Sequence, residues 1–361
     1  DVRQRQTSAD FRVYADGHLR AEAVQVTPAD APQELEISLR GTRELRLEVS
    51  TSQWDYCHAV WIEPTLIPAT SARDTDRVFV DCLGRAEIEL PPAAPTADLC
   101  LATVASPGME SWLDSLLVSW RENAQCPHAV VAVFCFHANP ELRRIIDHHG
   151  AVCVDCKGLA PVNMAAKSVL YSVAHVVRAK AFICFDADVL VLRPLEDLRA
   201  SIRALRKEAV FVARDSANLP NLQVALERIY GSSADEVARH RGQNAWNFAQ
   251  YPHVVNDGVI AGSERAMQSV DATIRSMPGM QTWIAAAEDS YPWRNQFVFN
   301  LALAKRDCCV VIDDRMNWQL NHREIQIDRS TGCVRSPGSG EPITCMHFNG
   351  RGRQKHRQLQ Q

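Results

Sequence analysis

The chain has 361 residues, of which 46% are hydrophobic and 23% are charged, and its formal net charge at pH 7 is -4. This length exceeds that of a usual single domain, and the apolar fraction is sufficient for two cores of unequal size. The weak net charge gives no field for holding a polyanion, which excludes nucleic acid as the main partner. No apolar run reaches the roughly 18–20 residues of a membrane span, and the opening segment DVRQRQTSAD lacks the apolar core of a signal peptide.

Twelve cysteines leave two alternatives, a disulfide framework or buried free thiols. Four of them lie inside apolar runs that are typical of strands: Cys100, Cys135, Cys184 and Cys345. This setting favours thiols packed as small hydrophobic side chains. The C-x-x-C pair Cys153 and Cys156 lacks a second pair at zinc-finger spacing and lacks a helix start between its thiols. We therefore expect a reducing, cytoplasmic compartment; because the sequence starts at Asp1 rather than at Met, upstream residues stay an open question.

The first region, residues 10–68, alternates apolar and polar residues in short bursts such as DFRVYADG, LEISLRG and ELRLEVS. This pattern predicts a small antiparallel β domain. Residues 91–97, PPAAPTA, are predicted to form a linker, because proline and small residues nucleate neither regular element. We accordingly assign residues 1–90 to the β domain and residues 98–361 to a second, larger domain.

The second region alternates apolar runs with helical segments. The runs are LCLATVAS, AVVAVFCF, AVCVDC, AFICFDADVLVL, AVFVARD, VVNDGVIAG and CCVVIDD. Runs that are apolar on both faces indicate an α/β domain whose sheet is covered by helices on both sides. A helix is predicted after Asn139, a plausible cap, with Pro140 in the first turn. The segment 163–180 also has helical periodicity.

Asp186 and Asp188 follow an apolar strand directly, so they emerge at its carboxyl end, where open α/β sheets place ligands. The D-x-D spacing lets two oxygen ligands reach one divalent cation that keeps positions open for phosphate oxygens. Paired acids in a surface turn are the plain alternative. An aspartyl-phosphate phosphatase is a second one, with 313–314 as its later acidic motif. Against it, Leu190 stands where that loop has Thr or Val, and roughly ninety residues of α/β pattern precede the pair.

Four segments in one order make residues 98–361 similar to a GT-A fold glycosyltransferase of family 8, the glycogenin and lipopolysaccharide galactosyltransferase group. The helix carrying Lys167, followed by FICFDADVLVL, resembles the family's helix with a basic residue before a strand that ends in DADVLV. The segment VVNDGVIAG resembles the family's N-x-G segment, and NQFVFNLAL resembles its D-Q-x-x-x-N motif. The segment HFNGRGRQKH resembles its closing HF-x-G-x-x-K motif. The resemblance implies a nucleotide-sugar-binding domain with a mixed, mostly parallel sheet flanked by helices. It also implies sugar transfer from a UDP-sugar to a hydroxyl of a carbohydrate or glycoconjugate, with retention.

The resemblance also implies ligands for a metal and a donor. Asp186, Asp188 and His347 would coordinate Mn2+ or Mg2+, an O/O/N set that suits manganese; a buried, hydrogen-bonded core histidine is the alternative for His347. The implied donor-binding residues are Thr103, Lys167, Asp186, Gly350, Arg353 and Lys355. Arg353 stands where the family usually has Lys. Alternatives are a strand-end hydroxyl for Thr103, an exposed helix face for Lys167, and a solvated basic tail for residues 351–355.

The catalytic residues implied by the resemblance are Asn256 and Asp257, which would bind sugar hydroxyls, and Gln296, which would lie near the anomeric carbon. An Asn-Asp-Gly turn is the plain alternative for the first two. Asn295 stands where the family has Asp, and an amide cannot act as base or nucleophile.

Two routes remain open for a chain with Asn295. In the first route, Glu288 or Asp289 would substitute for the missing carboxylate. Alternatively, a front-face mechanism lets the leaving phosphate take the acceptor proton, and then no such group is needed.

Residues 10–68 resemble the C-terminal half of the NPCBM module, a β-sandwich associated with carbohydrate binding. FRVYADGHL, ELEISLRGTRELRLEVS and DYCHAVWIEPTL stand in the order of that module. Trp54, Tyr56 and Trp61 would offer aromatic faces for sugar CH groups, with core packing as the alternative for Trp61. This region and Asn295 leave a second hypothesis, a non-catalytic carbohydrate-binding protein on a decayed transferase domain.

Overall fold

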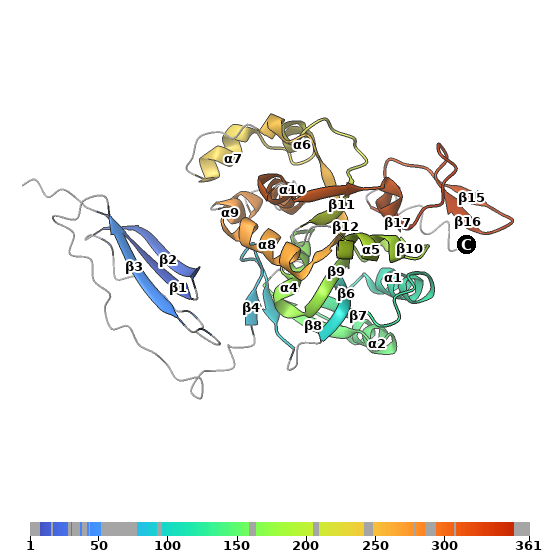
Figure 1. The fold of residues 1–361 in the computed structure, drawn as a ribbon, viewed down its shortest axis with the longest axis horizontal. Helices are drawn as coiled ribbons and strands as arrows, with labels where there is room; N and C mark the ends of the chain where they lie inside the picture. The colour runs from blue at the N-terminus through green and yellow to red at the C-terminus, as the bar shows by residue number, and fades with distance from the viewer. Residues whose placement is uncertain are drawn as a thin grey trace, which may run out of the picture. The chain divides into compact units, whose positions relative to one another are not determined.

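The computed structural model describes residues 8–15, 17–27, 30, 37, 42, 44–51, 78–91, 96–158, 164–204, 209–241, 248–277, 279–285, 294–306 and 308–349. The chain divides into two compact units, Asp1–Asp76 and Arg77–Gln361. Each unit has its own sheet, and the larger unit carries the helices (Figure 1).

The smaller unit contains an antiparallel sheet of β1 (Ala9–Ala15), β2 (His18–Val26) and β3 (Leu45–Thr51) in the order β2-β1-β3. Val13 pairs with Ala21 on one side and Leu47 on the other, so apolar side chains share one face of this sheet. The small antiparallel β region predicted from the alternation is confirmed. Three predicted sugar contacts lie outside the described residues: Trp54, Tyr56 and Trp61.

The larger unit is built on a nine-stranded mixed sheet in the order β13-β11-β12-β9-β6-β7-β8-β5-β4. Its strands are β4 (Val78–Val80), β5 (Glu87–Glu89), β6 (Thr96–Ala105), β7 (Val130–Phe136), β8 (Val152–Lys157), β9 (Arg178–Phe185), β11 (Val210–Arg214), β12 (Val255–Ser263) and β13 (Cys309–Ile312). Parallel pairing is confined to β9-β6-β7-β8 and to β11-β13, because β12 and the β4–β5 hairpin run antiparallel. The mixed α/β class is confirmed, and each predicted apolar run supplies a strand.

Helices cover both faces of this sheet (Figure 1). On one face lie α1 (Glu110–Asn123), α2 (Pro140–His148) and α5 (Glu196–Ala204). On the other lie α3 (Ser168–Tyr171), α4 (Val173–Val176), α6 (Leu222–Arg228), α7 (Ala234–Arg241), α8 (Glu264–Arg275), α9 (Met280–Ala285) and α10 (Arg294–Arg306). Leu101 of β6 packs in the core on the α1, α2 and α5 side, and Ala102 packs in the core on the opposite side. Both faces of this strand are therefore buried, which is why its sequence is apolar throughout.

The division between the two units lies upstream of the linker predicted at residues 91–97. The assignment of residues 1–90 to the N-terminal domain would place β4 and β5 there, but Glu87 and Ile88 pair with Lys157 and Cys156 of β8. Strand β6 begins at Thr96, inside the predicted linker. Three-residue strands carry too little pattern to indicate which sheet they join, because their partner is remote in sequence.

Local signals account for α2 but only partly for segment 163–180. The Asn139 side chain accepts a hydrogen bond from the Leu142 amide at 2.8 Å, and Pro140 opens the helix as predicted. The second segment is a 3-10 turn (Met164–Lys167, η4) followed by α3 and α4, which Ser172 separates. The Ser172 hydroxyl accepts from the Cys82 amide at 2.9 Å and donates to Asp271 at 2.6 Å. These two tertiary hydrogen bonds of Ser172 stabilise the interruption between α3 and α4.

Every cysteine in the described part of the chain is a free thiol, and the four from apolar runs are buried as predicted. Cys153 and Cys156 both lie on β8, where successive side chains alternate between faces. Cys153 therefore packs against the core under α1 and α2, and Cys156 belongs to the opposite core. The strand itself separates the two thiols of the C-x-x-C pair.

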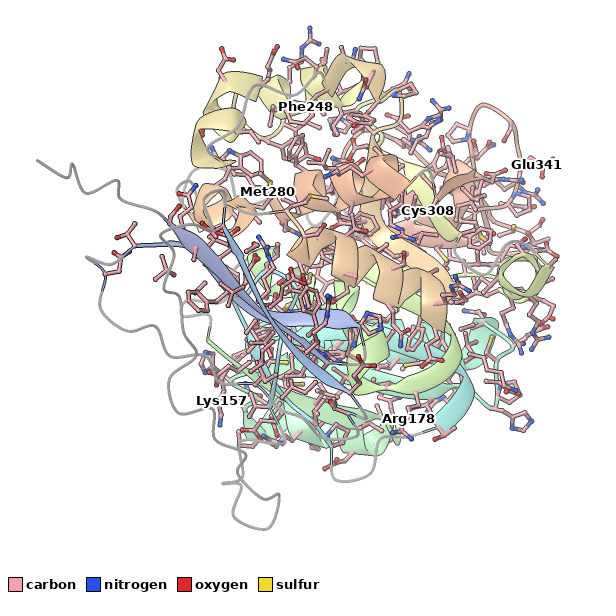
Figure 2. The ribbon with its side chains drawn as sticks, turned by 60° about the vertical axis from the view of Figure 1, so that its left-hand side comes forward. Lys157, Arg178, Phe248, Met280, Cys308 and Glu341 are labelled. Carbon is pink, nitrogen blue, oxygen red and sulfur yellow. The ribbon has the colours of Figure 1, made fainter. Side chains whose placement is uncertain are left out.

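The two ends of the parallel strands in the larger unit can be told apart by residues at their termini. Lys157 is the last residue of β8 and Arg178 the first of β9, and they mark opposite ends of the parallel strands (Figure 2). Functional side chains are expected at the carboxyl end, beyond Phe185 of β9. Within the residues described, no helix has the length and apolar character to cross a membrane.

Candidate functional site

A small second sheet positions His347 beside the D-x-D pair. Strands β10 (Val189–Val191), β17 (Cys345–His347) and β14 (Trp318–Gln319) pair in the order β10-β17-β14, with Val189 opposite His347. The Val189 amide donates to the Asp186 carbonyl at 3.1 Å, which closes the turn after β9. The Phe348 amide donates to the Asp188 carbonyl at 2.9 Å. Backbone bonds thus bring the HF segment onto the D-x-D turn.

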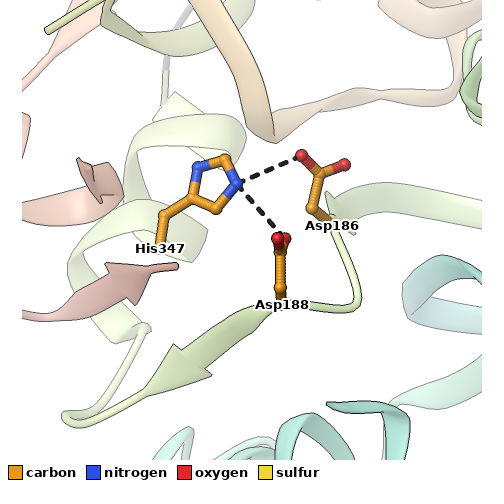
Figure 3. Close-up of side chains that lie close together, drawn as sticks. All are labelled: Asp186, Asp188 and His347. Atoms are coloured by element: carbon orange, nitrogen blue, oxygen red, sulfur yellow. Dashed lines mark ion pairs between the residues drawn. The ribbon is translucent and has the colours of Figure 1, made fainter. Parts of the chain in front are cut away.

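The three predicted metal ligands converge at this point. His347 Nε2 lies 3.3 Å from Asp186 Oδ2 and 3.3 Å from Asp188 Oδ1 (Figure 3). The ligand atoms of the three residues all lie within 4.8 Å of one another. His347 Nδ1 lies 3.0 Å from Asn317 Oδ1, so Nε2 is the nitrogen left facing the carboxylates. Two carboxylates and one imidazole nitrogen fit a divalent cation such as Mn2+.

The cluster is strongly charged. Burial opposes the positive charge of His347, but Asp188 and Asp186 outweigh burial and raise its pKa to about 9. Burial likewise opposes the charge of Lys167, whose pKa Asp186 and Asp257 raise. Burial opposes ionisation of Asp186, while Lys167 and His347 lower its pKa. Because a ligand of a cation must be unprotonated, binding of a cation at this cluster would be coupled to release of the His347 proton.

A cavity of about 300 Å3 opens beside the cluster. The predicted site residues that line it are Lys167, Asp186, Asp188, Asn256, Asp257, Gln296 and His347. Asp215, Asn321 and His322 also line it, although the sequence did not single them out. Residues from eight segments of the chain therefore share one cavity, and most of the residues that line it are polar or charged.

Lys167 is buried, so the prediction's alternative of an exposed helix face is wrong. Its Nζ lies 2.7 Å from Asp186 Oδ1 and 2.7 Å from Asp257 Oδ1. The Tyr171 hydroxyl donates to the other Asp257 oxygen and accepts from Asn295 Nδ2 at 3.2 Å. Burial and the Asp257 carboxylate raise the pKa of Tyr171, which keeps its hydroxyl protonated. Asn295 Oδ1 is buried and has no hydrogen-bond partner among the described residues.

Asn256, Asp257 and Gly258 lie inside β12, so the turn alternative for them is wrong. Pairing with β11 jumps from Ile260 to Asn256, which leaves an irregularity over the residues between them. Such a bulge re-aims side chains. It turns Asp257 toward Lys167, and it brings Asn256 Nδ2 within 3.3 Å of Gln296 Oε1.

Gln296 has two more partners that sequence reasoning missed. Its Nε2 lies 3.3 Å from Asp215 Oδ2 and 3.1 Å from the Tyr230 hydroxyl. Asp215 follows the apolar run AVFVAR, just as Asp186 follows its own strand, so the same strand-end rule could have found it. Tyr230 and Tyr171 carry no comparable signal, because each acts through a contact remote in sequence.

Other predicted residues are not brought into the cavity. Thr103 is fully buried in β6, and its hydroxyl has no hydrogen-bond partner in the described part of the chain. It does not line the cavity, so its nucleotide-binding role stays a prediction. Several predicted residues lie outside the described residues: Gly350, Arg351, Arg353, Lys355, Glu288 and Asp289.

Gly258→Ala is expected to disrupt the cluster, because an added Cβ would lie 2.3 Å from His347 Cε1 and 2.4 Å from Nδ1. Such overpacking costs about 1–3 kcal/mol of unfolding free energy. We also expect the stabilisation by Mn2+ to disappear. Urea unfolding with and without Mn2+ measures both effects. Gly338→Ala is the matched control, because nothing lies within 4 Å of its added Cβ; equal behaviour of the two variants would contradict the prediction.

Comparison with known proteins concerns the two units separately. Residues 1–67 match the model of the NPCBM/NEW2 domain. The matched residues fall within the smaller unit. No protein with a curated description is significantly similar in sequence to this chain.

Solved structures with a related fold include glycosyltransferases. The galactosyltransferase LgtC, in complex with donor and acceptor sugar analogues, is 14% identical with a TM-score of 0.45, over 70% of this chain and 87% of that chain. Mouse xyloside xylosyltransferase 1 is 14% identical with a TM-score of 0.43, over 72% and 99%. The bifunctional glycosyltransferase WbbM is 10% identical with a TM-score of 0.47, over 73% and 47%. At these identities the likeness concerns the fold alone.

Proposed function

We propose that this chain is a metal-dependent glycosyltransferase that moves a sugar from a nucleotide-sugar, a UDP-sugar, to a hydroxyl acceptor with retention. The observation that carries the proposal is the convergence of Asp186, Asp188 and His347 within 4.8 Å beside a cavity lined mostly by polar and charged residues. The cluster lies beyond the carboxyl end of β9, where α/β sheets bind nucleotides. The order of the four sequence motifs points the same way.

The residues of the cluster would hold Mn2+ or Mg2+, which neutralises a diphosphate leaving group when bound. During transfer, the acceptor oxygen bonds to the anomeric carbon as the bond from that carbon to the diphosphate oxygen breaks. The electron pair stays on the phosphate oxygen, which takes the acceptor's proton. In this proposal Lys167 supplies positive charge to the departing group, together with Arg353 and Lys355.

The state of the cavity carboxylates supports a front-face reaction. Both oxygens of Asp257 already accept hydrogen bonds, from Lys167 and Tyr171. Both oxygens of Asp215 accept as well, from the Ala217 amide and from Gln296. The sequence has Asn295 where the family that it resembles has Asp, so this position also supplies no carboxylate nucleophile. Attack from the side of the leaving group requires none of these acids, and it retains configuration.

A second candidate is a non-catalytic glycan-binding protein. The NPCBM/NEW2 match at residues 1–67 and the amide of Asn295 favour it. The two candidates differ in one property, which is dependence on a nucleotide and a metal together.

Thermal unfolding with a panel of nucleotide-sugars separates them. We expect a UDP-sugar to raise the Tm in Mn2+ but not in EDTA, since a ligand at 100 times its Kd stabilises the native state by about 2.7 kcal/mol. His347→Gln is the control, because it removes one ligand nitrogen and keeps a polar side chain. Glycan binding that persists in EDTA, with no response to any nucleotide-sugar, would overturn the transferase proposal.

A further inference from the structure

A chain of hydrogen-bonded amides leads away from His347 on the side opposite the carboxylates. His347 Nδ1 lies 3.0 Å from Asn317 Oδ1, and Asn317 Nδ2 donates to Asn256 Oδ1 at 2.9 Å. Asn256 Oδ1 also accepts from the Gly258 amide at 2.9 Å. Asn317 ends the short turn η6 (Asp314–Asn317) and is fully buried. Three elements, β12, η6 and β17, are therefore linked side chain to side chain.

The direction of these bonds is fixed by a backbone group. An amide N–H can only donate, so the Asn256 atom that faces Gly258 must be the oxygen. Asn317 must then turn its NH2 group toward that oxygen and its carbonyl toward His347. A carbonyl only accepts, so Nδ1 of His347 must carry a proton. In the neutral ring the lone pair is then on Nε2, the nitrogen that faces the two carboxylates.

The other end of the chain enforces the same direction. Asn256 Nδ2 donates to Gln296 Oε1 at 3.3 Å, and Gln296 Nε2 donates to Asp215 Oδ2 at 3.3 Å. An ionised carboxylate only accepts, so Asp215 fixes Gln296 as the Gly258 amide fixes Asn256. A backbone donor and a carboxylate acceptor thus determine the orientation of every amide between Asp215 and His347.

We propose that Asn317, oriented by Asn256, is a positioning residue that holds His347 in the Nδ1–H tautomer and presents Nε2 to a divalent cation. This rests on the proposed function, since it requires the cation site. The proposal also assigns a structural role to the Asn-x-Gly segment of β12, residues 256–258. Asn256 Oδ1 is committed to two protein donors, and Gly258 leaves room for the His347 ring.

Two substitutions separate positioning from simple packing. Asn317→Asp keeps an acceptor for the His347 Nδ1–H, but it loses the donor to Asn256. Asn317→Leu has similar volume and loses both. Loss of an outer hydrogen-bond partner of a metal-bound histidine costs about 10–100-fold in metal affinity. We expect Asn317→Leu to weaken Mn2+ binding by this factor, and Asn317→Asp to stay closer to the wild type. A purely structural role predicts the reverse order of Mn2+ affinities, because the Asp variant buries an additional negative charge and turns one of its oxygens toward the acceptor Asn256 Oδ1.

Calorimetric titration of the full chain with Mn2+ measures these affinities, and thermal unfolding identifies any variant that does not fold. A second measurement needs no Asn317 variant. In the wild type loaded with diamagnetic Zn2+, long-range 1H–15N correlation shows which His347 nitrogen is protonated, with His347→Gln assigning the signals. We expect a protonated Nδ1 and a metal-bound Nε2.

The outcomes distinguish the two proposals. A protonated Nε2, or equal Mn2+ affinities of the wild type and Asn317→Leu, would overturn the positioning role and leave the transferase proposal standing. Failure of the wild type to bind Mn2+ or Zn2+ would overturn both. The expected affinity order with a protonated Nδ1 supports the positioning role even for a protein that transfers no sugar.

Discussion

Replacing Asp188 with Asn is expected to abolish metal-dependent donor hydrolysis and sugar transfer. The substitution keeps the shape of the side chain and removes the negative charge that faces His347 Nε2 at 3.3 Å. Changing even an outer partner of a metal ligand costs about 10–100-fold, so loss of a ligand charge should lower kcat/KM by about 100-fold or more. Release of UDP from a UDP-sugar in saturating Mn2+ measures this loss.

Asp147→Asn is the matched control for Asp188→Asn. Asp147 is an exposed residue of α2, and its side chain forms no ion pair with any other described residue. The control should retain wild-type hydrolysis and wild-type unfolding. Unchanged hydrolysis by folded Asp188→Asn in metal-replete buffer would remove the basis for assigning this cluster to catalysis.

Replacing Lys167 with Met is expected to be the most destabilising change at the site. The Lys167 side chain is only 5% exposed, and its ammonium lies between Asp186 and Asp257. Removing one partner of a buried ion pair leaves an uncompensated charge, which costs about 3–5 kcal/mol. Methionine has similar length, so lost packing contributes little. Urea unfolding monitored by circular dichroism measures the difference.

A surface pair provides the control for Lys167→Met. Lys180 also contacts a carboxylate at 2.7 Å, that of Asp98, but the two side chains are 83% and 68% exposed. Lys180→Met should leave the unfolding midpoint unchanged, because water screens such a pair. The double variant Lys167→Met/Asp257→Asn should recover part of the lost stability, since it removes one of the two carboxylate charges that lose Lys167 as their partner. Equal losses for both lysine variants would show that burial does not govern this pair.

Much of the fold follows from local pattern. Each apolar run that predicted a strand in residues 98–361 forms one, because strands buried on both faces need unbroken apolar sequence. The helix after Asn139 begins as predicted, because its cap and Pro140 act within one turn. The positions of Asp186 and Asp188 also follow from the strand that precedes them.

The sequence by itself determined the strands that apolar runs form in residues 98–361, the capped helix and the three residues able to form a metal cluster, since each depends on residues adjacent in the chain or on a motif. Only the tertiary structure decided that Asp257, 90 residues away, neutralises Lys167 together with Asp186, and that the amide of Asn317, 30 residues away, orients His347. It also decided that Asn256 and Gly258 lie in a strand rather than a turn. Burial and hydrogen-bond partners arise when remote segments pack, and no local pattern records them.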